Sequence, residues 1–227
     1  MSGFYERCFI CAFDNEKICP GRCFECAEPE ILKQEWIYSL GLYFPRFREG
    51  YRESRWSRAV AMTKRNCLPV IASFGRILAW FISRYLSDLK PCLIVNVPGF
   101  MDNSGGGLFQ KADICTTNLL LESVADNLRD DKWIIEGNLL VQTRKKPVKQ
   151  HCCKTDAKRM KNIRDIFAVS EPGRTKDKNI ILLDDVVTSG ATMKECTEVL
   201  YESGAASVVG MTLARTFRKR ESFSINR

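Results

Sequence analysis

Two adjacent carboxylates, Asp184 and Asp185, directly follow four apolar residues at positions 180–183. An apolar run of this length predicts a buried strand, and open α/β sheets bind their ligands at the carboxyl ends of parallel strands. A short loop of hydroxyl-bearing and small residues comes next, and a helix is expected to begin near Thr192. The loop residues that we expect to contact a ligand are Thr188, Ser189, Gly190, Ala191 and Thr192.

These residue types suit a phosphorylated sugar. Backbone N–H groups of residues 188–192, with the helix N-terminus behind them, would form a nest for one phosphate, and Gly190 lets the backbone approach it closely. Asp184 and Asp185 would accept hydrogen bonds from sugar hydroxyls and could help to hold Mg²⁺. The plainer alternative is a strand–turn–helix whose acids cap the helix. The loop is not a Walker motif, because no Gly-Lys-Thr/Ser sequence follows the glycine.

The N-terminal segment contains two Cys-x-x-Cys pairs, formed by Cys8 with Cys11 and by Cys23 with Cys26. Such pairs suit tetrahedral Zn²⁺, because each short turn points two thiolates at one metal. The stretch between them is too short for a core of its own, so zinc would supply its stability. Cys19 could replace one of the four ligands. The module either supports the edge of the domain or contacts nucleic acid or a partner.

A second region of unusual composition is basic. Residues 143–164 contain nine Lys and Arg and a single acid, Asp156, and the whole chain has 35 Lys and Arg against 27 Asp and Glu. Such a segment could cover a polyphosphate or follow a nucleic-acid backbone. The alternative is a mobile surface loop neutralised by counter-ions. The candidate contacts are Arg144, Lys145, Lys146, Lys149 and Arg159.

Hydrophobic periodicity predicts the elements that must position these residues. We expect strands over residues 36–44, 93–98, 133–141, 180–183 and 206–213, and helices within 46–65 and over 69–89, 111–128 and 192–204. Strands that alternate with helices predict an α/β fold with an open, mainly parallel sheet flanked by helices. We divide the chain into a zinc-binding module, residues 1–35, and the α/β domain, residues 36–227.

The composition and the distribution of charge argue against several classes of protein. A balance of 45% hydrophobic and 27% charged residues excludes disorder along the whole chain. No run of about 18 apolar residues is free of charge, so no transmembrane helix is expected, and the N-terminus lacks the apolar core of a signal peptide. Eleven cysteines, an odd number, argue against a complete disulfide framework. We therefore expect a soluble cytoplasmic protein with reduced thiols.

Residues 180–193 resemble the 5-phosphoribosyl-1-pyrophosphate (PRPP) signature of type I phosphoribosyltransferases. The remaining chain is similar to the ComF family of competence-associated, phosphoribosyltransferase-like proteins. The similarity lies in the four-cysteine ribbon, an aromatic strand and these single residues: Lys64, Val97, Pro98, Thr143, Arg144, Gln150, Arg159, Asn162, Phe167, Ala214 and Arg215. The resemblance implies a type I phosphoribosyltransferase fold with a small N-terminal zinc ribbon.

In type I phosphoribosyltransferases the two acids contact the ribose hydroxyls, and the following loop wraps the 5-phosphate. The resemblance assigns the first role to Asp184 and Asp185 and the second to residues 188–192, and it implies Mg²⁺ bound with PRPP. ComF relatives usually carry an Arg-Gly-Phe-Asn-Gln run after the Val-Pro pair. Residues 102–110 of this chain contain no arginine that would help to hold pyrophosphate. The basic segment 143–164 could compensate.

Two functions remain open from the sequence. The first is PRPP-dependent phosphoribosyl transfer to an acceptor that no residue pattern identifies, and no general acid or base can be named. The second is a catalytically inactive adaptor that binds DNA or partner proteins in competence or phage defence and uses the pocket as a ligand or phosphate sensor. Magnesium-dependent PRPP binding would favour the first function. Salt-dependent DNA binding without PRPP binding would favour the second.

Overall fold

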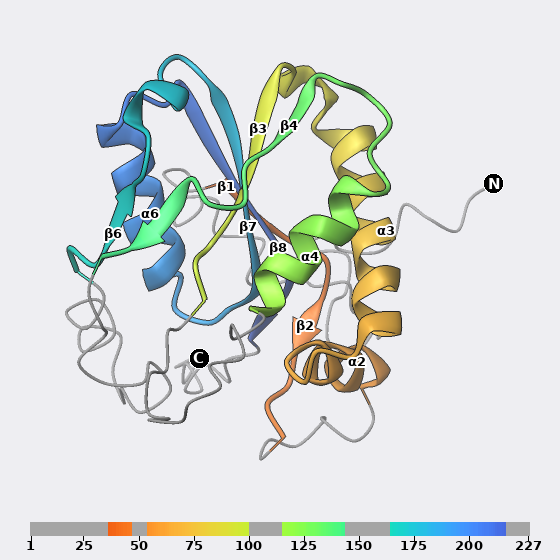
Figure 1. Ribbon diagram of the computed structural model, residues 1–227. Helices are drawn as coiled ribbons and strands as arrows, with labels where there is room; N and C mark the ends of the chain where they lie inside the picture. The colour runs from red at the N-terminus through yellow and green to blue at the C-terminus, as the bar shows by residue number, and fades with distance from the viewer. Residues whose placement is uncertain (1–35, 47–53, 100–114, 144–163, 217–227) are drawn as a thin grey trace, which may run out of the picture.

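The main feature of the fold is an open sheet in the strand order β1-β8-β7-β3-β4, in which every neighbouring pair is parallel (Figure 1). It is seen in a computed structural model that describes residues 36–46, 54–99, 115–143 and 164–216. The strands are β1 (Trp36–Ser39), β3 (Cys92–Asn96), β4 (Trp133–Ile135), β7 (Asn179–Val187) and β8 (Ser207–Thr216). The expected mainly parallel sheet flanked by helices is confirmed.

The edge strand predicted over residues 36–44 is present but interrupted. β1 and the short β2 (Leu42–Tyr43) both pair with β8, and the two pairings share one register. The break falls at residues 40–41. A Cβ on Gly41 would lie 2.5 Å from Nε1 of Trp56, so glycine makes room for this ring. The same Nε1 donates a hydrogen bond to the carbonyl oxygen of Leu213 in β8, at 3.2 Å.

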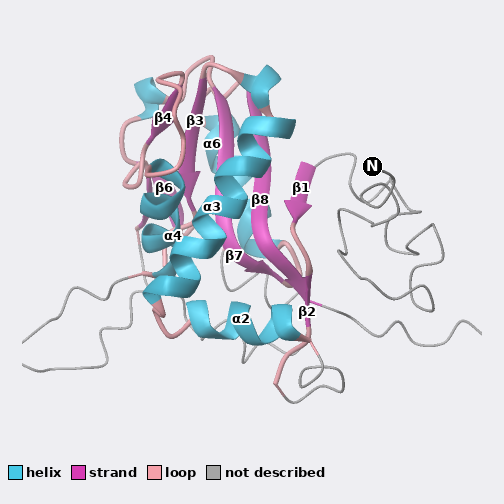
Figure 2. Cartoon of the chain, turned by 90° about the vertical axis from the view of Figure 1, so that its right-hand side faces the viewer, coloured by secondary structure: helices cyan, strands magenta, loops and turns pink. Residues whose placement is uncertain are grey.

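Helices cover both faces of the sheet (Figures 1 and 2). One face carries α2 (Arg55–Thr63), α3 (Leu68–Tyr85) and α4 (Thr116–Ala125), and the other carries α6 (Ala191–Glu202). In Figure 2, α3 lies in front of the sheet and α6 behind it. Strands that are buried on both faces read as continuous apolar runs, and all five residues of β3 are buried. Ile94 packs in the α3–α4 core, whereas Leu93 and Val95 pack in the α6 core.

The predicted helices are present with shifted ends. The helix predicted over residues 69–89 is α3 as far as Tyr85, where the chain passes into a short 3-10 helix, Ser87–Leu89. α4 is the described part of the helix predicted over 111–128, of which residues 111–114 lie outside the described ranges. Among the described helices none is long and apolar enough on its own to cross a membrane. α2 and α3 together meet that length and composition, but a bend of 110° separates them.

The single strand predicted over residues 133–141 is wrong. The chain turns after β4, and β5 (Leu140–Gln142) pairs antiparallel with β6 (Phe167–Val169) in a separate two-stranded sheet. Gly137 and Asn138 are turn-forming residues that separate two apolar runs. A prediction based on hydrophobicity alone therefore treats the two runs as one strand. β6 has no counterpart in the prediction, and the buried side chain of its Phe167 packs in the α6 core.

Candidate functional site

Asp184 and Asp185 lie where the sheet reverses its winding. β3 is followed by α4 and then by β4 on one side, whereas β7 is followed by α6 and then by β8 on the other side. Open α/β sheets bind ligands at the carboxyl ends of the strands at such a switch point. The ladder between β3 and β7 ends at Asn96 opposite Leu183, one residue before the acids, while β7 continues along β8 to Val187. The topology therefore places the acid pair where a ligand site is expected.

A tight loop connects the acid pair to α6. Gly190 precedes the helix, and its φ of 75° lies in the left-handed region that favours glycine. A Cβ there would meet nothing within 4 Å, so the backbone angle requires glycine and packing does not. The cap residue Gly190 has no side chain that could bond to the first turn of α6, and that turn contains no acid. The two acids lie within β7 and outside the first turn of α6. A helix N-terminus of this kind can bind an anion.

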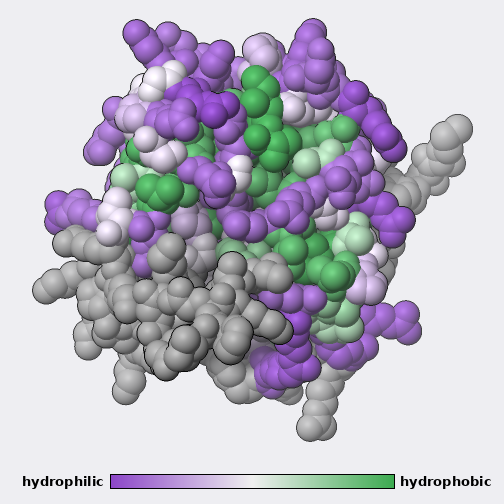
Figure 3. Space-filling view, viewed as in Figure 1, coloured by the Kyte–Doolittle hydropathy of each residue, from purple (hydrophilic) through white to green (hydrophobic). Residues whose placement is uncertain are grey.

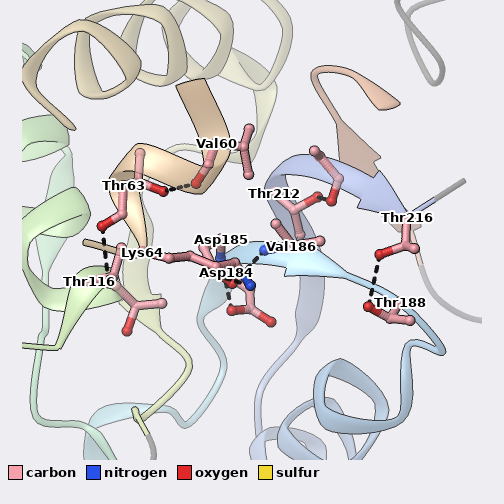
Figure 4. Close-up of polar contacts among 12 residues, drawn as sticks. Val60, Thr63, Lys64, Thr116, Asp184, Asp185, Val186, Thr188, Thr212 and Thr216 are labelled. Carbon is pink, nitrogen blue, oxygen red and sulfur yellow. Dashed lines mark hydrogen bonds and ion pairs between the residues drawn. The ribbon is translucent and has the colours of Figure 1, made fainter. Parts of the chain in front are cut away.

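The loop is tied to the sheet and to the core. Thr188 Oγ1 lies 2.9 Å from Thr216 Oγ1 at the end of β8 (Figure 4). Ser189 Oγ accepts a weak hydrogen bond from Ala191 N at 3.5 Å, and the Ala191 side chain is buried. Thr192 follows in the first turn of α6, which begins one residue earlier than expected. The loop residues selected from the sequence thus form one strand–loop–helix unit with the acids.

Each carboxylate of the pair has one oxygen bonded to the backbone. Asp184 Oδ1 accepts a hydrogen bond from Asp185 N at 2.8 Å, and Asp185 Oδ1 accepts one from Val186 N at 2.6 Å (Figure 4). Asp185 Oδ2 faces the ammonium of Lys64, with 3.4 Å between the two atoms. The Asp185 side chain is 18% exposed. A carboxylate has about four lone-pair sites, so backbone donors can orient these acids and leave acceptor capacity for a ligand.

Lys64, just after the last residue of α2, is one of the residues that carry the ComF resemblance, but no role in the site could be assigned to it from the sequence. Burial lowers the pKa of its ammonium, but the carboxylates of Asp185 and Asp184 outweigh burial and raise that pKa above its ordinary value. The ring centre of Tyr43 lies 5.8 Å from the Lys64 Nζ atom. No local sequence signal could have found the pairing, because α2 and β7 are far apart in the chain and meet only in the fold.

The turn between α2 and α3 holds Lys64 in this position. Asn66 adopts a φ of 55°, and its N–H donates to Thr63 O at 2.8 Å. Thr63 is fully buried, and its hydroxyl donates to Val60 O at 2.7 Å. Thr116, at the start of α4, donates to Asn66 Oδ1 at 3.1 Å. The turn is therefore fixed from two helices, and Lys64 reaches the acids from an ordered support.

The carboxyl end of β3 carries a buried amide. Asn96 is 2% exposed, and its Nδ2 donates to Asn118 Oδ1 at 2.6 Å and to Thr117 Oγ1 at 3.3 Å, in the first turn of α4. Its Oδ1 has no hydrogen-bond partner within the described part of the chain. These bonds fix the start of α4 against the strand that leads into Val97 and Pro98.

Two groups of predicted site residues, and loop 102–110, lie outside the described residues. The groups are the expected zinc ligands Cys8, Cys11, Cys23 and Cys26, with Cys19 as the alternative, and the expected polyanion contacts Arg144, Lys145, Lys146, Lys149 and Arg159. Both ends of the basic segment are described. Thr143 N donates to Ile166 O at 2.8 Å, and Asp165 N donates to Glu195 of α6 at 2.5 Å. The chain therefore enters and leaves the basic segment near α6.

The acid pair fits a magnesium ion only in part. Within the described ranges, no group of three or more His, Cys, Asp or Glu side chains could hold a metal ion. Asp184 and Asp185 offer two carboxylates. The Lys64 ammonium already pairs with Asp185, and its positive charge disfavours a metal ion at that carboxylate. Mg²⁺ prefers few protein carboxylates and takes its remaining ligands from substrate phosphates and water. The residues therefore fit a Mg²⁺ that arrives with a phosphorylated ligand.

No protein-family model matches the chain. A search of curated proteins finds no match either. Among solved structures, a hypoxanthine phosphoribosyltransferase from Staphylococcus aureus is 13% identical, with a TM-score of 0.37, over 67% of this chain and 69% of that chain. A glutamine PRPP amidotransferase from B. subtilis is 15% identical (TM-score 0.36), over 63% and 26%. An adenine phosphoribosyltransferase from Leishmania donovani is 11% identical (TM-score 0.33), over 87% and 87%. At these TM-scores the similarities carry no argument about ligand or activity, which must come from the residues of this chain.

Proposed function

We propose that the chain binds PRPP, or a closely related phosphorylated sugar, and transfers the phosphoribosyl group to an acceptor. One observation carries the proposal. Two carboxylates oriented by the backbone are followed by a helix N-terminus that begins directly after Gly190, at the switch point of the sheet. Carboxylates accept hydrogen bonds from hydroxyls, and a helix N-terminus behind a glycine binds phosphate. A sugar phosphate presents both groups in one small molecule.

In the proposed reaction the bond between C1 of the ribose and the pyrophosphate breaks, while a nucleophile of the acceptor forms a bond to C1. Asp184 and Asp185 would orient the ribose through its hydroxyls, and the N–H groups of residues 188–192 would hold the 5-phosphate. The contribution of these groups is positioning, together with negative charge near a carbon that becomes positive. Mg²⁺, when bound with PRPP, supplies charge stabilisation to the leaving pyrophosphate.

The basic segment, the zinc module and the biological setting complete the proposal. Residues 143–164, whose ends lie near α6, would contribute cations to the pyrophosphate, for which loop 102–110 has no arginine. The cysteines of residues 1–35 would bind one structural Zn²⁺. The ComF resemblance would place the activity in DNA uptake, in the cytoplasm.

A thermal-shift titration with PRPP tests the proposal. Ligand at about 100 times its dissociation constant stabilises a protein by about 2.7 kcal/mol, which for a chain of this size is roughly 5–10 °C in Tm. We expect such a rise with PRPP, larger with Mg²⁺ than without it. Inorganic triphosphate serves as a control that carries a similar negative charge but has no ribose. The absence of a rise up to millimolar PRPP would contradict the proposal.

A second candidate, a DNA-binding adaptor, is favoured by the surface of α2 and α3. Residues 54–87 contain six Lys and Arg and no acid. Trp80 and Tyr85 are exposed, and the Arg84 guanidinium lies 5.9 Å from the Tyr85 ring centre. Figure 3, viewed as in Figure 1, shows apolar side chains between polar ones over the region of β4 and α4. Exposed aromatic rings among basic residues suit single-stranded nucleic acid, whose bases stack on them.

The second candidate has its own test, which leaves the acid pair untouched. Arg76→Gln combined with Arg84→Gln should weaken binding of single-stranded DNA and reduce the salt dependence of the logarithm of affinity by about 1.4, since each phosphate contact contributes about 0.7. PRPP affinity should not change. Absence of DNA binding at about 50 mM salt, where electrostatic binding is strong, would exclude this candidate.

A further inference from the structure

The Lys64 ammonium lies beside the acid pair but is not required to orient the two carboxylates. Asp185 is already oriented by the hydrogen bond from Val186 N. The contact between Asp185 Oδ2 and Lys64 Nζ is 3.4 Å long, whereas a full charge-assisted hydrogen bond of this type measures about 2.7–2.9 Å. The Lys64 side chain is 45% exposed. The pair is therefore loose, and one member faces solvent at the edge where a ligand would enter.

The position of Lys64 is nevertheless well defined. Figure 4 shows the side chain reaching from the end of α2 toward Asp184 and Asp185. The turn behind it is held by Asn66, which bonds to Thr63 in α2 and to Thr116 in α4. The two carboxylates raise the pKa of Lys64, so the ammonium is charged at neutral pH. A fixed, charged and half-exposed donor stands beside two acids that the proposed function assigns to ribose hydroxyls.

We propose that Lys64 is a ligand-contacting residue that changes partner: it pairs with Asp185 in the free protein and with the diphosphate of bound PRPP. The inference rests on the proposed function and names the residue that recognises the diphosphate. Ribose hydroxyls that donate to the carboxylates weaken the attraction of Asp185 for Lys64. The diphosphate brings several negative charges to a site that already holds two, and Lys64 is the described cation that forms an ion pair with one of these acids. No covalent bond changes in this step.

The competing explanation is that Lys64 only balances the charge of Asp185. Two ligands separate these explanations: PRPP, and ribose 5-phosphate, which has the same 5-phosphate and hydroxyls but no diphosphate. If Lys64 contacts the diphosphate, its removal affects PRPP alone. If Lys64 only balances Asp185, its removal affects both ligands equally, because both use the carboxylates.

Calorimetric titration of both ligands into Lys64→Met, Lys64→Arg and wild-type protein tests the inference. We expect Lys64→Met to weaken the binding of PRPP at least about tenfold and the binding of ribose 5-phosphate less than about threefold. Only PRPP has the diphosphate, so only PRPP loses a hydrogen bond between charged groups. Lys64→Arg keeps the charge and should recover part of the PRPP affinity. Arg65→Met, which removes an exposed cation from the same turn, is the matched control and should change neither affinity.

Three outcomes would overturn the inference. Equal losses for the two ligands would mean that Lys64 serves only Asp185, and unchanged affinities would mean that it serves neither. If the wild-type protein bound neither ligand, the proposed function itself would be wrong. This result is distinguishable from a failure of the Lys64 inference, because it is seen without any variant. Circular dichroism and Tm of Lys64→Met and of a second variant, Lys64→Gln, separate lost binding from lost folding.

Discussion

A Lys–Asp ion pair lies near each end of the parallel strands, and the two pairs are built differently. We call the end where the strands begin the amino edge and the end where they finish the carboxyl edge. At the amino edge, Lys90 pairs with Asp130, and its ammonium lies 4.9 Å from the centre of the Trp133 ring. Asp130 also accepts a hydrogen bond from Lys132 N at 2.9 Å. The hydrogen bonds from Lys90 and from Lys132 hold the pKa of Asp130 below its ordinary value. Both charged groups of this pair are satisfied by their immediate neighbours.

At the carboxyl edge the same two residue types form a looser pair. Lys64 and Asp185 are 3.4 Å apart, and Lys64 keeps almost half of its side chain exposed. The Tyr43 ring centre lies 5.8 Å from Lys64 Nζ, farther than the 4.9 Å between the Trp133 ring centre and Lys90 Nζ. The Lys90–Asp130 pair therefore serves to stabilise the fold. The Lys64–Asp185 pair leaves both side chains with capacity to contact a ligand.

A hollow in the described surface does not coincide with the acid pair. A surface hollow of about 610 Å³ lies beside the amino-edge pair and is lined by Lys90, Asp130 and Trp133 among others. Its acid and base already satisfy each other, and it lies away from the switch point of the sheet. The carboxyl edge has the acid pair, the left-handed Gly190 and the N-terminus of α6. We therefore assign the ligand site from the chemistry and the topology.

The largest effect is expected from a negative charge in the loop. Thr192→Asp places a carboxylate where we locate the 5-phosphate, so PRPP affinity should fall about a hundredfold or more, as like charges in contact cost several kcal/mol. The same carboxylate in the first turn of α6 should leave Tm unchanged or raise it, because acids at a helix N-terminus contribute about 0.3–1 kcal/mol. Calorimetric titration and thermal melts measure the two effects. Thr192→Ser is the control. Unchanged PRPP affinity in Thr192→Asp would mean that the 5-phosphate does not bind at this loop.

A smaller effect is expected from Gly190→Ala. The left-handed φ costs an alanine about 1–2 kcal/mol, and no neighbouring atom adds to that cost. Urea unfolding should show this loss, with PRPP affinity reduced severalfold as the loop shifts. Gly173→Ala is the matched control, because a Cβ there also meets nothing within 4 Å and the backbone has an ordinary φ. Equal stability of the two variants would contradict the role given to the loop angle.

At the amino edge, Lys90→Met should leave PRPP affinity unchanged and lower Tm slightly. The methionine keeps an apolar chain against Trp133 but loses the charge that Asp130 pairs with. This is the reverse of the pattern expected for Lys64→Met. A change of PRPP affinity in Lys90→Met would mean that the two edges are not independent.

The smallest effect concerns the pH dependence of the amino-edge pair. The pKa of Asp130 is lowered in the folded chain, so its carboxylate contributes stability above the ordinary carboxyl range and loses that contribution as pH falls through the lowered pKa. The Tm difference between wild type and Asp130→Asn should therefore be positive at pH 7, begin to shrink near the ordinary carboxyl pKa of about 4, and vanish only below the lowered pKa of Asp130. A difference that persists in acid would show that asparagine disturbs the turn and that the charge is not responsible.

The parts of this site that the sequence could predict are those whose residues are consecutive. The apolar run, the two acids and the Gly190 loop lie within one short segment, and each imposes a local structure, so strand, loop and helix follow directly. The parallel sheet follows from the alternation of strands and helices. The division of residues 133–141 between two sheets was missed, because a turn at Gly137 competes with a continuous apolar pattern.

Lys64 could not be assigned to the site from the sequence for a different reason. Its approach to Asp185 depends on the bend between α2 and α3 and on the contact of that turn with Thr116. These are tertiary features with no local signature. The ComF resemblance singles out Lys64 but gives it no role, and only the fold places two carboxylates beside it.

The most direct test of the account is a calorimetric titration of PRPP with Mg²⁺ into wild-type protein, the double variant Asp184→Asn with Asp185→Asn, and Asp130→Asn. We predict binding to wild type and to Asp130→Asn with equal affinity. The double variant should keep its fold and lose about a hundredfold or more in affinity, since two hydrogen-bonded charges are removed. Equal affinity of the double variant and the wild type would contradict the assignment of the site to the carboxyl edge.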